Sequence, residues 1–312
     1  MELITELASY NSTDKTAVTL GKFDGLHKGH HKLLEEIKKY KALHEDVKSV
    51  VFVMDMTQFL LDKGITRKLL MTNCERQSHL QQDEIDCLIQ LPFTHDFASM
   101  EAEEFIEKIL VEKLHAEYIV VGADYRFGHD AKGDVDLLVK YASVYGYHID
   151  IVAKEKYNER IISSTYIREC LMNGQTELAN TMLGYPYRIQ GIVEHGQQLG
   201  RTLGFPTMNV TPEPEKLLPK NGVHFCRVQL DGVWYNGIGN VGMKPTVTDE
   251  KRVLVEVFVL GFEGDAYDKH IQIEFCTFSR SEKKFSSVKE LKTQVDQDIA
   301  DGKLYFEKKS FT

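Results

Sequence analysis

Thr16-Ala17-Val18-Thr19-Leu20 runs directly into Gly21-Lys22-Phe23-Asp24-Gly25-Leu26-His27-Lys28-Gly29-His30 near the start of the chain. The short apolar run predicts a β-strand. The segment from Lys28 to Leu43 predicts a helix, with these apolar residues on or near one side: Leu33, Leu34, Ile37, Tyr40 and Leu43. Glycines at 21, 25 and 29 allow the connecting backbone to come close to a ligand. The stretch therefore predicts a strand, a glycine-rich loop and a helix in succession.

Residues 16–183 continue this alternation of short apolar runs and longer helical patterns. Further strands are predicted at 49–54, 84–91, 118–121 and 148–152, and helices at 101–114 and 134–145. The helix at 101–114 turns five apolar residues inward: Phe105, Ile106, Ile109, Leu110 and Leu114. Because such alternation is typical of α/β domains, we expect a doubly wound parallel sheet with helices on both faces.

The pattern changes at Gly184-Tyr185-Pro186, after which short strands are separated by turns. These strands are predicted at 187–194, 223–230, 234–241, 253–260 and 270–277. Asp231-Gly232 between two of them is typical of a two-residue hairpin turn, and a final helix at 287–299 begins with a serine N-cap. We therefore expect an antiparallel β-barrel with a terminal helix, and we place the two domains at 1–184 and 185–312.

The composition is ordinary for a soluble globular protein, and 312 residues suffice for two domains. A formal net charge of −9 argues against a general nucleic-acid-binding surface, although local cations and helix N-termini can still bind phosphate. The five cysteines are scattered and include no Cys-x-x-Cys, which disfavours disulfides and a zinc site. We see no signal peptide and no apolar run near the roughly 20 residues that span a bilayer. We expect a cytoplasmic protein, and its oligomeric state stays open.

His27 and His30 are the first candidates for chemistry. They are three residues apart, so both side chains can project from one turn of the predicted helix. In a doubly wound sheet this crevice between strand and helix is where ligands bind, and the helix N-terminus offers N–H groups to phosphate. Two imidazoles there suggest stabilisation of charge during phosphoryl or nucleotidyl transfer. The alternative is that they are only polar residues at a helix start.

The pattern Gly-x-Phe-Asp-Gly-x-His-x-Gly-His resembles the His-x-Gly-His nucleotidyltransferases and, among them, the bacterial bifunctional riboflavin kinase/FAD synthetase family. Residues 121–128, Val-Gly-Ala-Asp-Tyr-Arg-Phe-Gly, are similar to the family's flavin-side loop. Residues 163–168, Ser-Ser-Thr-Tyr-Ile-Arg, are similar to its second ATP motif. On physical grounds alone, serine and threonine can cap the following helix while Arg168 lies one turn inside it. The resemblance extends from about residue 16 to about residue 302.

The resemblance implies roles for individual residues of the first domain. Charge in the transfer step would be stabilised by His27, His30 and Arg168. The nucleotide and the flavin would be bound by a larger set of residues: Gly21, Phe23, Asp24, Gly25, Gly29, Asp124, Arg126, Phe127, Ser163, Ser164 and Thr165.

One segment departs from the family's pattern. The family's second strand leads into a Pro-His-Pro-like segment that faces the nucleotide and the flavin, and here the corresponding stretch is Met54-Asp55-Met56-Thr57-Gln58. The histidine and both prolines are absent. The adenylyltransferase half could therefore be slower, altered in substrate or impaired.

The second domain carries Gly200-Arg201-Thr202-Leu203-Gly204-Phe205-Pro206-Thr207-Met208-Asn209. The glycines allow this loop to approach a phosphate, and Thr207 and Asn209 offer the oxygen atoms that Mg²⁺ prefers. The segment resembles the riboflavin kinase signature, in which Pro-Thr-x-Asn holds the magnesium nucleotide. The resemblance implies nucleotide binding by Gly200, Arg201, Gly204, Thr207 and Asn209, with Thr207 and Asn209 also as metal ligands.

Glu256 is the candidate general base of the second domain. It interrupts the apolar strand at 253–260, where a lone carboxylate needs a partner or a purpose. The pattern alone also allows an exposed position on a one-sided strand. The family's kinase domain has a catalytic glutamate in this strand, so the resemblance implies that role for Glu256.

The two halves together imply two successive reactions. The barrel would phosphorylate riboflavin to FMN with ATP and Mg²⁺. The first domain would adenylylate FMN to FAD with a second ATP, releasing pyrophosphate. Three alternatives stay open: a riboflavin kinase with an impaired adenylyltransferase half, a flavin-binding regulatory protein, or a different nucleotidyl acceptor in the first domain.

Overall fold

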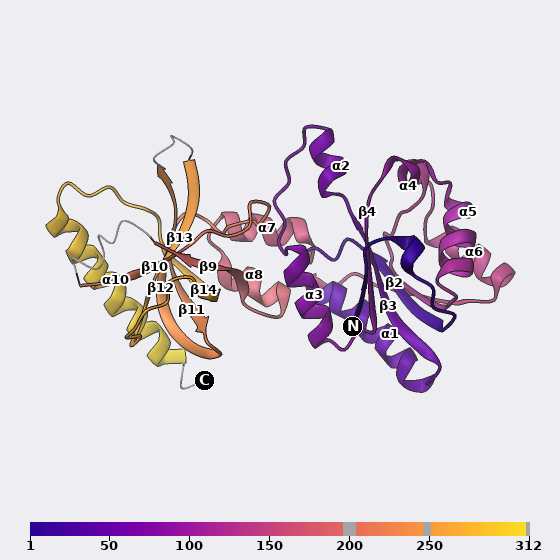
Figure 1. Ribbon diagram of the computed structural model, residues 1–312, viewed down its shortest axis with the longest axis horizontal. Coiled ribbons are helices and arrows are strands. Elements are labelled where there is room, and N and C mark those ends of the chain that lie inside the picture. Colours follow the sequence, from indigo (N-terminus) through magenta and orange to yellow (C-terminus); the bar gives the residue numbers. More distant parts are fainter. Residues whose placement is uncertain (196–203, 246–250, 310–312) are drawn as a thin grey trace. The chain divides into compact units, whose positions relative to one another are not determined.

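The computed structural model describes residues 1–195, 204–245 and 251–309, and the chain forms two compact units, Met1–Ser164 and Thr165–Thr312. The first unit contains a parallel sheet and the second a closed barrel, as the sequence predicts (Figure 1). The contacts assign residues 165–184 to the barrel unit. The boundary after residue 184 between two catalytic domains stays a prediction.

The first unit is built on a six-stranded sheet in which all neighbouring strands run parallel. The strands lie in the order β1-β4-β3-β2-β5-β6. Their bounds are β1 Glu2–Ile4, β2 Lys15–Gly21, β3 Val47–Asp55, β4 Cys87–Pro92, β5 Ala116–Gly122 and β6 His148–Val152. The chain builds outward from β2 through β3 to β4 and then adds β5 on the other side of β2, so the strand order reverses beside β2. The predicted doubly wound sheet is confirmed. In such sheets ligands bind where the strand order reverses, which here is at the carboxyl end of β2 and β5.

Helix α1 begins at Lys28 and ends at Leu43, as predicted. Its buried residues are Leu33, Leu34 and Ile37. The expectation for Leu43 was wrong, since that side chain is 81% exposed. Leu43 is six residues after Ile37, and at about 100° per residue its side chain points about 120° away from that of Ile37 around the helix. It therefore leaves the apolar side of the helix.

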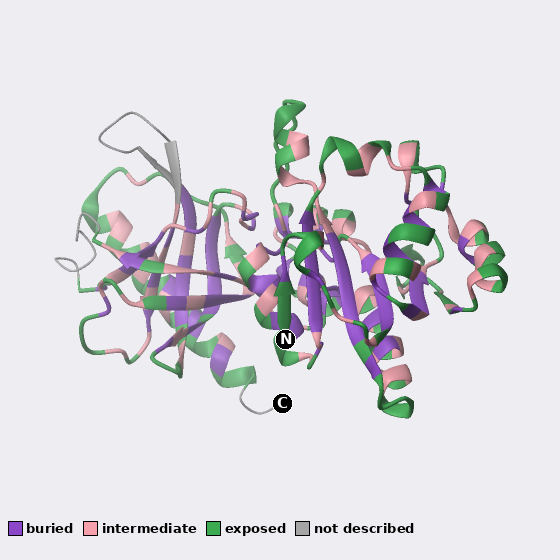
Figure 2. Ribbon diagram, turned by 45° about the vertical axis from the view of Figure 1, so that its right-hand side comes forward, coloured by how far each residue is buried: buried purple, intermediate pink, exposed green. Residues whose placement is uncertain are grey.

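The other helical segments of this unit are short: η1 Leu7–Ser9, α2 Thr57–Asp62, α3 Asn73–Gln82, α4 His95–Ser99, α5 Ala102–Glu104, η2 Phe105–Lys113, η3 His129–Ala131 and α6 Val135–Tyr145. Segments α5 and η2 form the helix predicted at 101–114, and all its expected inward residues are buried. They pack with Leu138 of α6 against Val18 and Phe52 of the sheet. Helices lie on both faces of the sheet, whose strands form the buried centre of the unit (Figure 2).

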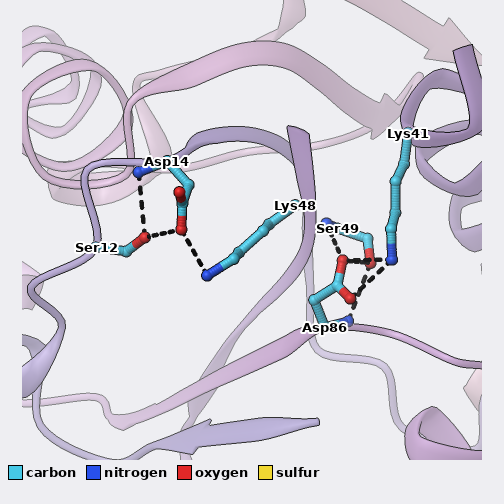
Figure 3. Close-up of polar contacts among 6 residues, drawn as sticks. All are labelled: Ser12, Asp14, Lys41, Lys48, Ser49 and Asp86. Atoms are coloured by element: carbon cyan, nitrogen blue, oxygen red, sulfur yellow. Dashed lines mark hydrogen bonds and ion pairs between the residues drawn. The ribbon is translucent and has the colours of Figure 1, made fainter. Parts of the chain in front are cut away.

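Polar contacts close the amino edge of this sheet, opposite the predicted site (Figure 3). Asp86 precedes β4 and accepts hydrogen bonds from the Ser49 backbone N–H at 2.8 Å and from its hydroxyl at 2.9 Å. Lys41, in the last turn of α1, donates to Asp86 at 2.7 Å. Asp14, before β2, accepts from the Ser12 hydroxyl at 2.6 Å and pairs with Lys48. These polar groups form hydrogen bonds and ion pairs with one another, so we assign this edge of the sheet a structural role.

The second unit is a closed antiparallel barrel with the strand order β10-β13-β12-β11-β14-β9, in which β9 also pairs with β10. The strands are β9 Tyr187–Glu194, β10 Thr207–Val210, β11 Gly222–Leu230, β12 Val233–Pro245, β13 Lys251–Val259 and β14 His270–Arg280. The predicted hairpin is confirmed, because Leu230 pairs with Val233 across Asp231 and Gly232, whose φ angles are 50° and 81°. Strand β10, which is only four residues long, is not among the strands that the sequence pattern predicts.

Among the residues that the structure describes, three helices accompany the barrel: α7 Ser164–Met172, α8 Thr176–Leu183 and α10 Val288–Lys309. The predicted N-cap of the last one is confirmed, since the Ser287 hydroxyl accepts from the Glu290 N–H at 3.2 Å. Helix α10 runs ten residues past its predicted end, and Phe306 in the added turns packs on Phe225 and Ile238 of the barrel. A pair of two-residue strands, β7 Lys156–Tyr157 and β8 Arg160–Ile161, precedes α7. In the described part of the chain, no helix is long and apolar enough to cross a bilayer.

Candidate active sites

The glycine-histidine loop, residues 21–30, leaves the carboxyl end of β2 and delivers His27 to the first position before α1. Gly25 has a φ of 91°, a conformation that glycine adopts without strain. A Cβ at Gly29 would lie 3.2 Å from the His27 ring, so glycine there allows the ring to fold against the backbone. The two predicted histidines are thus brought together by the loop that the sequence singled out.

The rings of His27 and His30 are stacked, with centroids 3.7 Å apart and planes inclined by 15°. Burial lowers the pKa of His27 to about 4. Burial also lowers the pKa of His30 well below 6.5, and nearby His27, His31 and Arg76 lower it further. Both imidazoles are therefore neutral near pH 7. Within the described residues no group bonds the buried Nδ1 of either ring. Each neutral ring has one N–H that can donate to a ligand.

Asp24 and Phe23 shape the loop from inside. The Asp24 carboxylate accepts from the backbone N–H of Leu70 at 2.8 Å, and its carbonyl oxygen accepts from the Ser164 hydroxyl at 2.7 Å. Phe23 is fully buried, with its ring centroid 5.0 Å from that of His30. These contacts give both residues a structural part, and their contact with nucleotide stays a prediction.

The predicted flavin-side loop follows β5, which pairs directly with β2, so the two loops leave the same edge of the sheet. Phe127 is buried in the core beside Phe105, with ring centroids 5.5 Å apart. Asp124 forms an ion pair with Lys154 at 2.6 Å, and Arg126 one with Asp134 at 2.8 Å. Phe127 therefore anchors the loop in the core, while Asp124 and Arg126 are exposed. Binding of flavin by these two charged residues stays a prediction.

The segment without the family's histidine, residues 54–58, ends β3 and begins α2. Asp55 accepts from the Thr57 backbone N–H at 2.9 Å, which fixes the turn into the helix. Phe59 of α2 contacts the Phe93 ring edge-on at 4.9 Å, and the His95 ring at 5.9 Å. An imidazole thus lies beside α2, contributed by the segment after β4.

The second ATP motif spans the division between the two units. Ser163 and Ser164 end the first unit, and Thr165 and Arg168 lie on α7 in the second. The Ser164 hydroxyl donates to the carbonyl oxygen of Asp24 in the glycine-histidine loop. Ser164, a predicted nucleotide-binding residue, is thus bonded directly to that loop. The joint action of Arg168 with the histidine pair stays a prediction.

The predicted kinase residues meet on neighbouring strands of the barrel. Asn209 of β10 pairs in register with Glu256 of β13, and Glu256 pairs with Asn240 of β12. Directly opposed residues project from the same face of a sheet, so these three side chains form a polar row. Thr207, two residues before Asn209, projects from the same face. Gly204 has a φ of 89°, whereas Gly200 and Arg201 lie outside the described residues.

The row lies on the outer face of the barrel. Val255 and Val257, on either side of Glu256, are fully buried and turn inward. Glu256 is half-buried, and Asn209 is 7% exposed. Residues of β13 therefore alternate between the inside and the outside of the barrel, as the exposed alternative for Glu256 required. Glu256 nevertheless shares its outer face with Thr207 and Asn209 of the Pro-Thr-x-Asn motif.

The comparisons with known proteins cover both units. The FAD synthetase family model matches residues 9–166, and the riboflavin kinase model matches residues 183–306. The bifunctional riboflavin kinase/FMN adenylyltransferase of Haemophilus influenzae is 33% identical over 309 residues, covering 98% of this chain and 99% of its own. The Escherichia coli K12 protein of the same name is 34% identical over 295 residues, covering 93% and 92%.

The chain belongs to the bifunctional riboflavin kinase/FMN adenylyltransferase family. A crystal structure described as a macrolide-efflux protein from Streptococcus pneumoniae superposes with a TM-score of 0.87 at 28% identity, covering 96% of this chain and 98% of that one. The likeness extends over both units. The efflux activity in that description concerns that protein alone.

The kinase half of this bifunctional family member has a donor set that suits Mg²⁺. Thr207 and Asn209 present a hydroxyl and an amide oxygen from one face of β10, with the Glu256 carboxylate on the adjacent strand. In residues 1–195, 204–245 and 251–309, no group of three His, Cys, Asp or Glu side chains forms a metal site. Mg²⁺ binds through few protein ligands when substrate phosphates supply the rest, and these residues fit such a site.

Proposed function

We propose that this chain phosphorylates riboflavin to FMN and then adenylylates FMN to FAD, using one ATP in each step. The observation that carries the proposal is the presence of both the stacked histidine pair and the polar row of the barrel in a chain that matches its bifunctional relatives over nearly their full length. ATP, riboflavin and FMN are the proposed substrates, and we propose a cytoplasmic location.

In the kinase step, the 5′-hydroxyl oxygen of riboflavin attacks the γ-phosphorus of ATP, and ADP leaves. Glu256 accepts the hydroxyl proton as general base. Thr207 and Asn209 hold Mg²⁺, which when bound neutralises charge on the nucleotide phosphates. Because phosphoryl transfer needs little covalent chemistry from the protein, positioning along the polar row supplies most of the rate.

In the adenylyl-transfer step, a phosphate oxygen of FMN attacks the α-phosphorus of the second ATP, and pyrophosphate leaves. His27 and His30 donate hydrogen bonds to the phosphates as charge builds up on them. Near pH 7 each neutral imidazole has one N–H that can donate such a hydrogen bond, while its other ring nitrogen is an acceptor. Arg168, Ser164 and Thr165 are proposed to bind the same phosphates.

The test is a time course of the purified chain with riboflavin, ATP and Mg²⁺, with flavins separated by chromatography. We expect FMN to form first and FAD to follow. Absence of both products from folded protein would refute the proposal.

A second candidate is a riboflavin kinase whose adenylyltransferase half is inactive. The sequence of residues 54–58, which lacks the family's histidine, favours it. It predicts FMN accumulation without FAD at any ATP concentration. Supplying FMN directly separates the candidates, since only the bifunctional enzyme converts it to FAD with release of pyrophosphate.

A further inference from the structure

Arg76 of α3 is a buried cation directly behind the glycine-histidine loop. Only 4% of the surface of Arg76 is exposed to solvent. Its Nε donates to the carbonyl oxygen of Phe23 at 3.4 Å, and its Nη1 donates to Asn73 Oδ1 and to Gln90 Oε1, both at 2.8 Å. Phe23 belongs to the loop after β2, and Gln90 belongs to β4. One guanidinium therefore connects three elements beneath the histidine pair.

The connection continues to the segment that lacks the family's histidine. Asn73 donates from Nδ2 to Asp55 Oδ2 at 2.9 Å, and the other Asp55 oxygen accepts from the Thr57 N–H. Burial raises the pKa of Asp55, but the hydrogen bonds from Thr57 and Asn73 outweigh it and lower the pKa overall. Arg76 thus reaches, through Asn73, the start of α2 as well as the glycine-histidine loop.

A buried guanidinium is costly unless its surroundings compensate it. Burial lowers the pKa of Arg76, and the negative charges of Asp24, Asp55 and Glu75 oppose that effect. The group stays a cation, because arginine is not deprotonated in proteins. A neutral apolar side chain would pack more cheaply, so the retained charge calls for a function that a purely structural contact would not need.

We propose that Arg76 is a positioning residue for adenylyl transfer, which fixes the glycine-histidine loop from behind and holds a permanent positive charge beside His30. The proposal rests on the proposed function of the first unit. The forked guanidinium donors of Arg76 fix the position of the Phe23 carbonyl and, through the loop backbone, the direction of the two histidine rings. Burial is the main cause of the lowered pKa of His30, and the charge of Arg76 lowers that pKa further. The same charge adds to the positive potential that a polyphosphate meets.

The charge acts on a small group of neighbours. The pKa of His30 is lowered by charge on His27, just before α1, on His31 in α1 and on Arg76 in α3. Each positive charge in this set disfavours protonation of His30. Removing the charge of Arg76 therefore raises the pKa of His30, whereas a lysine at position 76 keeps the charge and loses the fork.

The test compares Arg76→Met and Arg76→Lys with the wild type, by the rate of FAD formation from supplied FMN between pH 5 and pH 8. We expect R76M to lower kcat by about 100-fold, the effect of a misplaced catalytic group, and to move the acid limb of kcat/KM to higher pH. R76K should slow FAD formation while leaving the acid limb at its wild-type pH. Arg67→Met, at an exposed arginine before α3, should change neither quantity.

The riboflavin kinase rate of the same samples serves as the internal control for the barrel, and far-UV circular dichroism serves as the control for folding of the first unit. Folded R76M with a wild-type rate, or with an unmoved acid limb, would overturn the proposal. If R76M does not fold, R76K decides, because a wild-type rate of FAD formation in that variant would overturn it too. Failure of the proposed function is distinct, since the wild type itself would then make no FAD.

Discussion

His27 is an ordinary histidine until the fold buries it. Gly29 lets its ring lie against the backbone, His30 stacks on it, and burial lowers its pKa from 6.5 to about 4. The His-x-Gly-His spacing predicted that the two rings would meet. It could not predict that both would be neutral, because burial depends on elements distant in sequence.

This burial predicts a pH dependence of stability. The unfolded chain binds a proton at His27 below pH 6.5, and the folded chain does so only near pH 4. Stability from this group is therefore complete above pH 6.5 and is lost as the pH falls towards 4. Between pH 7 and pH 5 we expect a loss of about 2 kcal/mol from His27. Urea unfolding followed by circular dichroism measures it.

His27→Gln removes that titration, so the variant should lose about 2 kcal/mol less than the wild type between the two pH values. His44→Gln, at an exposed histidine after α1, is the matched control and should follow the wild type. Equal losses in His27→Gln and the wild type would contradict the burial of a neutral His27.

Glu256 carries the prediction for the second unit. Glu256→Gln keeps the shape of the polar row and removes the proton acceptor, so FMN formation from riboflavin should fall by about 100-fold or more. Glu263→Gln, in the exposed turn after β13, should leave the rate unchanged. A wild-type rate in Glu256→Gln would remove this residue from the mechanism.

At the scale of elements, the sequence predicted what its periodicity marks. The central strands and helix α1 were found because apolar residues repeat there at strand or helix spacing. Helix α3 was missed because it is largely polar, although Thr72 and Glu75 form a capping box that marks its start. Strand β10 was missed because four residues hold no periodicity, and its partners Glu194 and Glu256 lie on strands that only the closed barrel brings beside it.

The capping box leads to a prediction for α3, the helix that carries Arg76. The Thr72 hydroxyl accepts from the Glu75 N–H, and Glu75 in turn accepts from the Thr72 N–H at 2.9 Å. Thr72→Ala should lower the free energy of unfolding of the first unit by about 1 kcal/mol. FAD formation should slow while FMN formation does not. Thr94→Ala, which removes the exposed N-cap of α4, is the control for both rates. Equal effects of Thr72→Ala and Thr94→Ala on FAD formation would contradict a specific role of α3 in adenylyl transfer.

At the scale of the whole molecule, the first unit contains the glycine-histidine loop and the second contains the polar row of the barrel, while the second ATP motif crosses the division between them. The change from helix-strand alternation to short strands revealed two architectures, and both are confirmed. The sequence placed the change near residue 185, but contacts assign residues 165–184 to the barrel unit, because α8 packs on β9 and β14. Packing across distant segments decides such an assignment, and local pattern does not contain it.

We propose that one chain has two separate catalytic sites, and that the FMN made at one is the substrate of the other. The measurement that tests it most directly mixes two variants, His30→Ala and Glu256→Gln, with riboflavin, ATP and Mg²⁺. Alone, the first should stop at FMN, with adenylyl transfer reduced by about 100-fold, and the second should form almost no FMN.

Mixed, the two variants should make FAD, because FMN released by one is adenylylated by the other. His44→Ala is the control for the first variant and Glu263→Gln for the second, and both should make FAD unaided. A mixture of folded variants that makes no more FAD than the variants alone would contradict two separate sites in this chain.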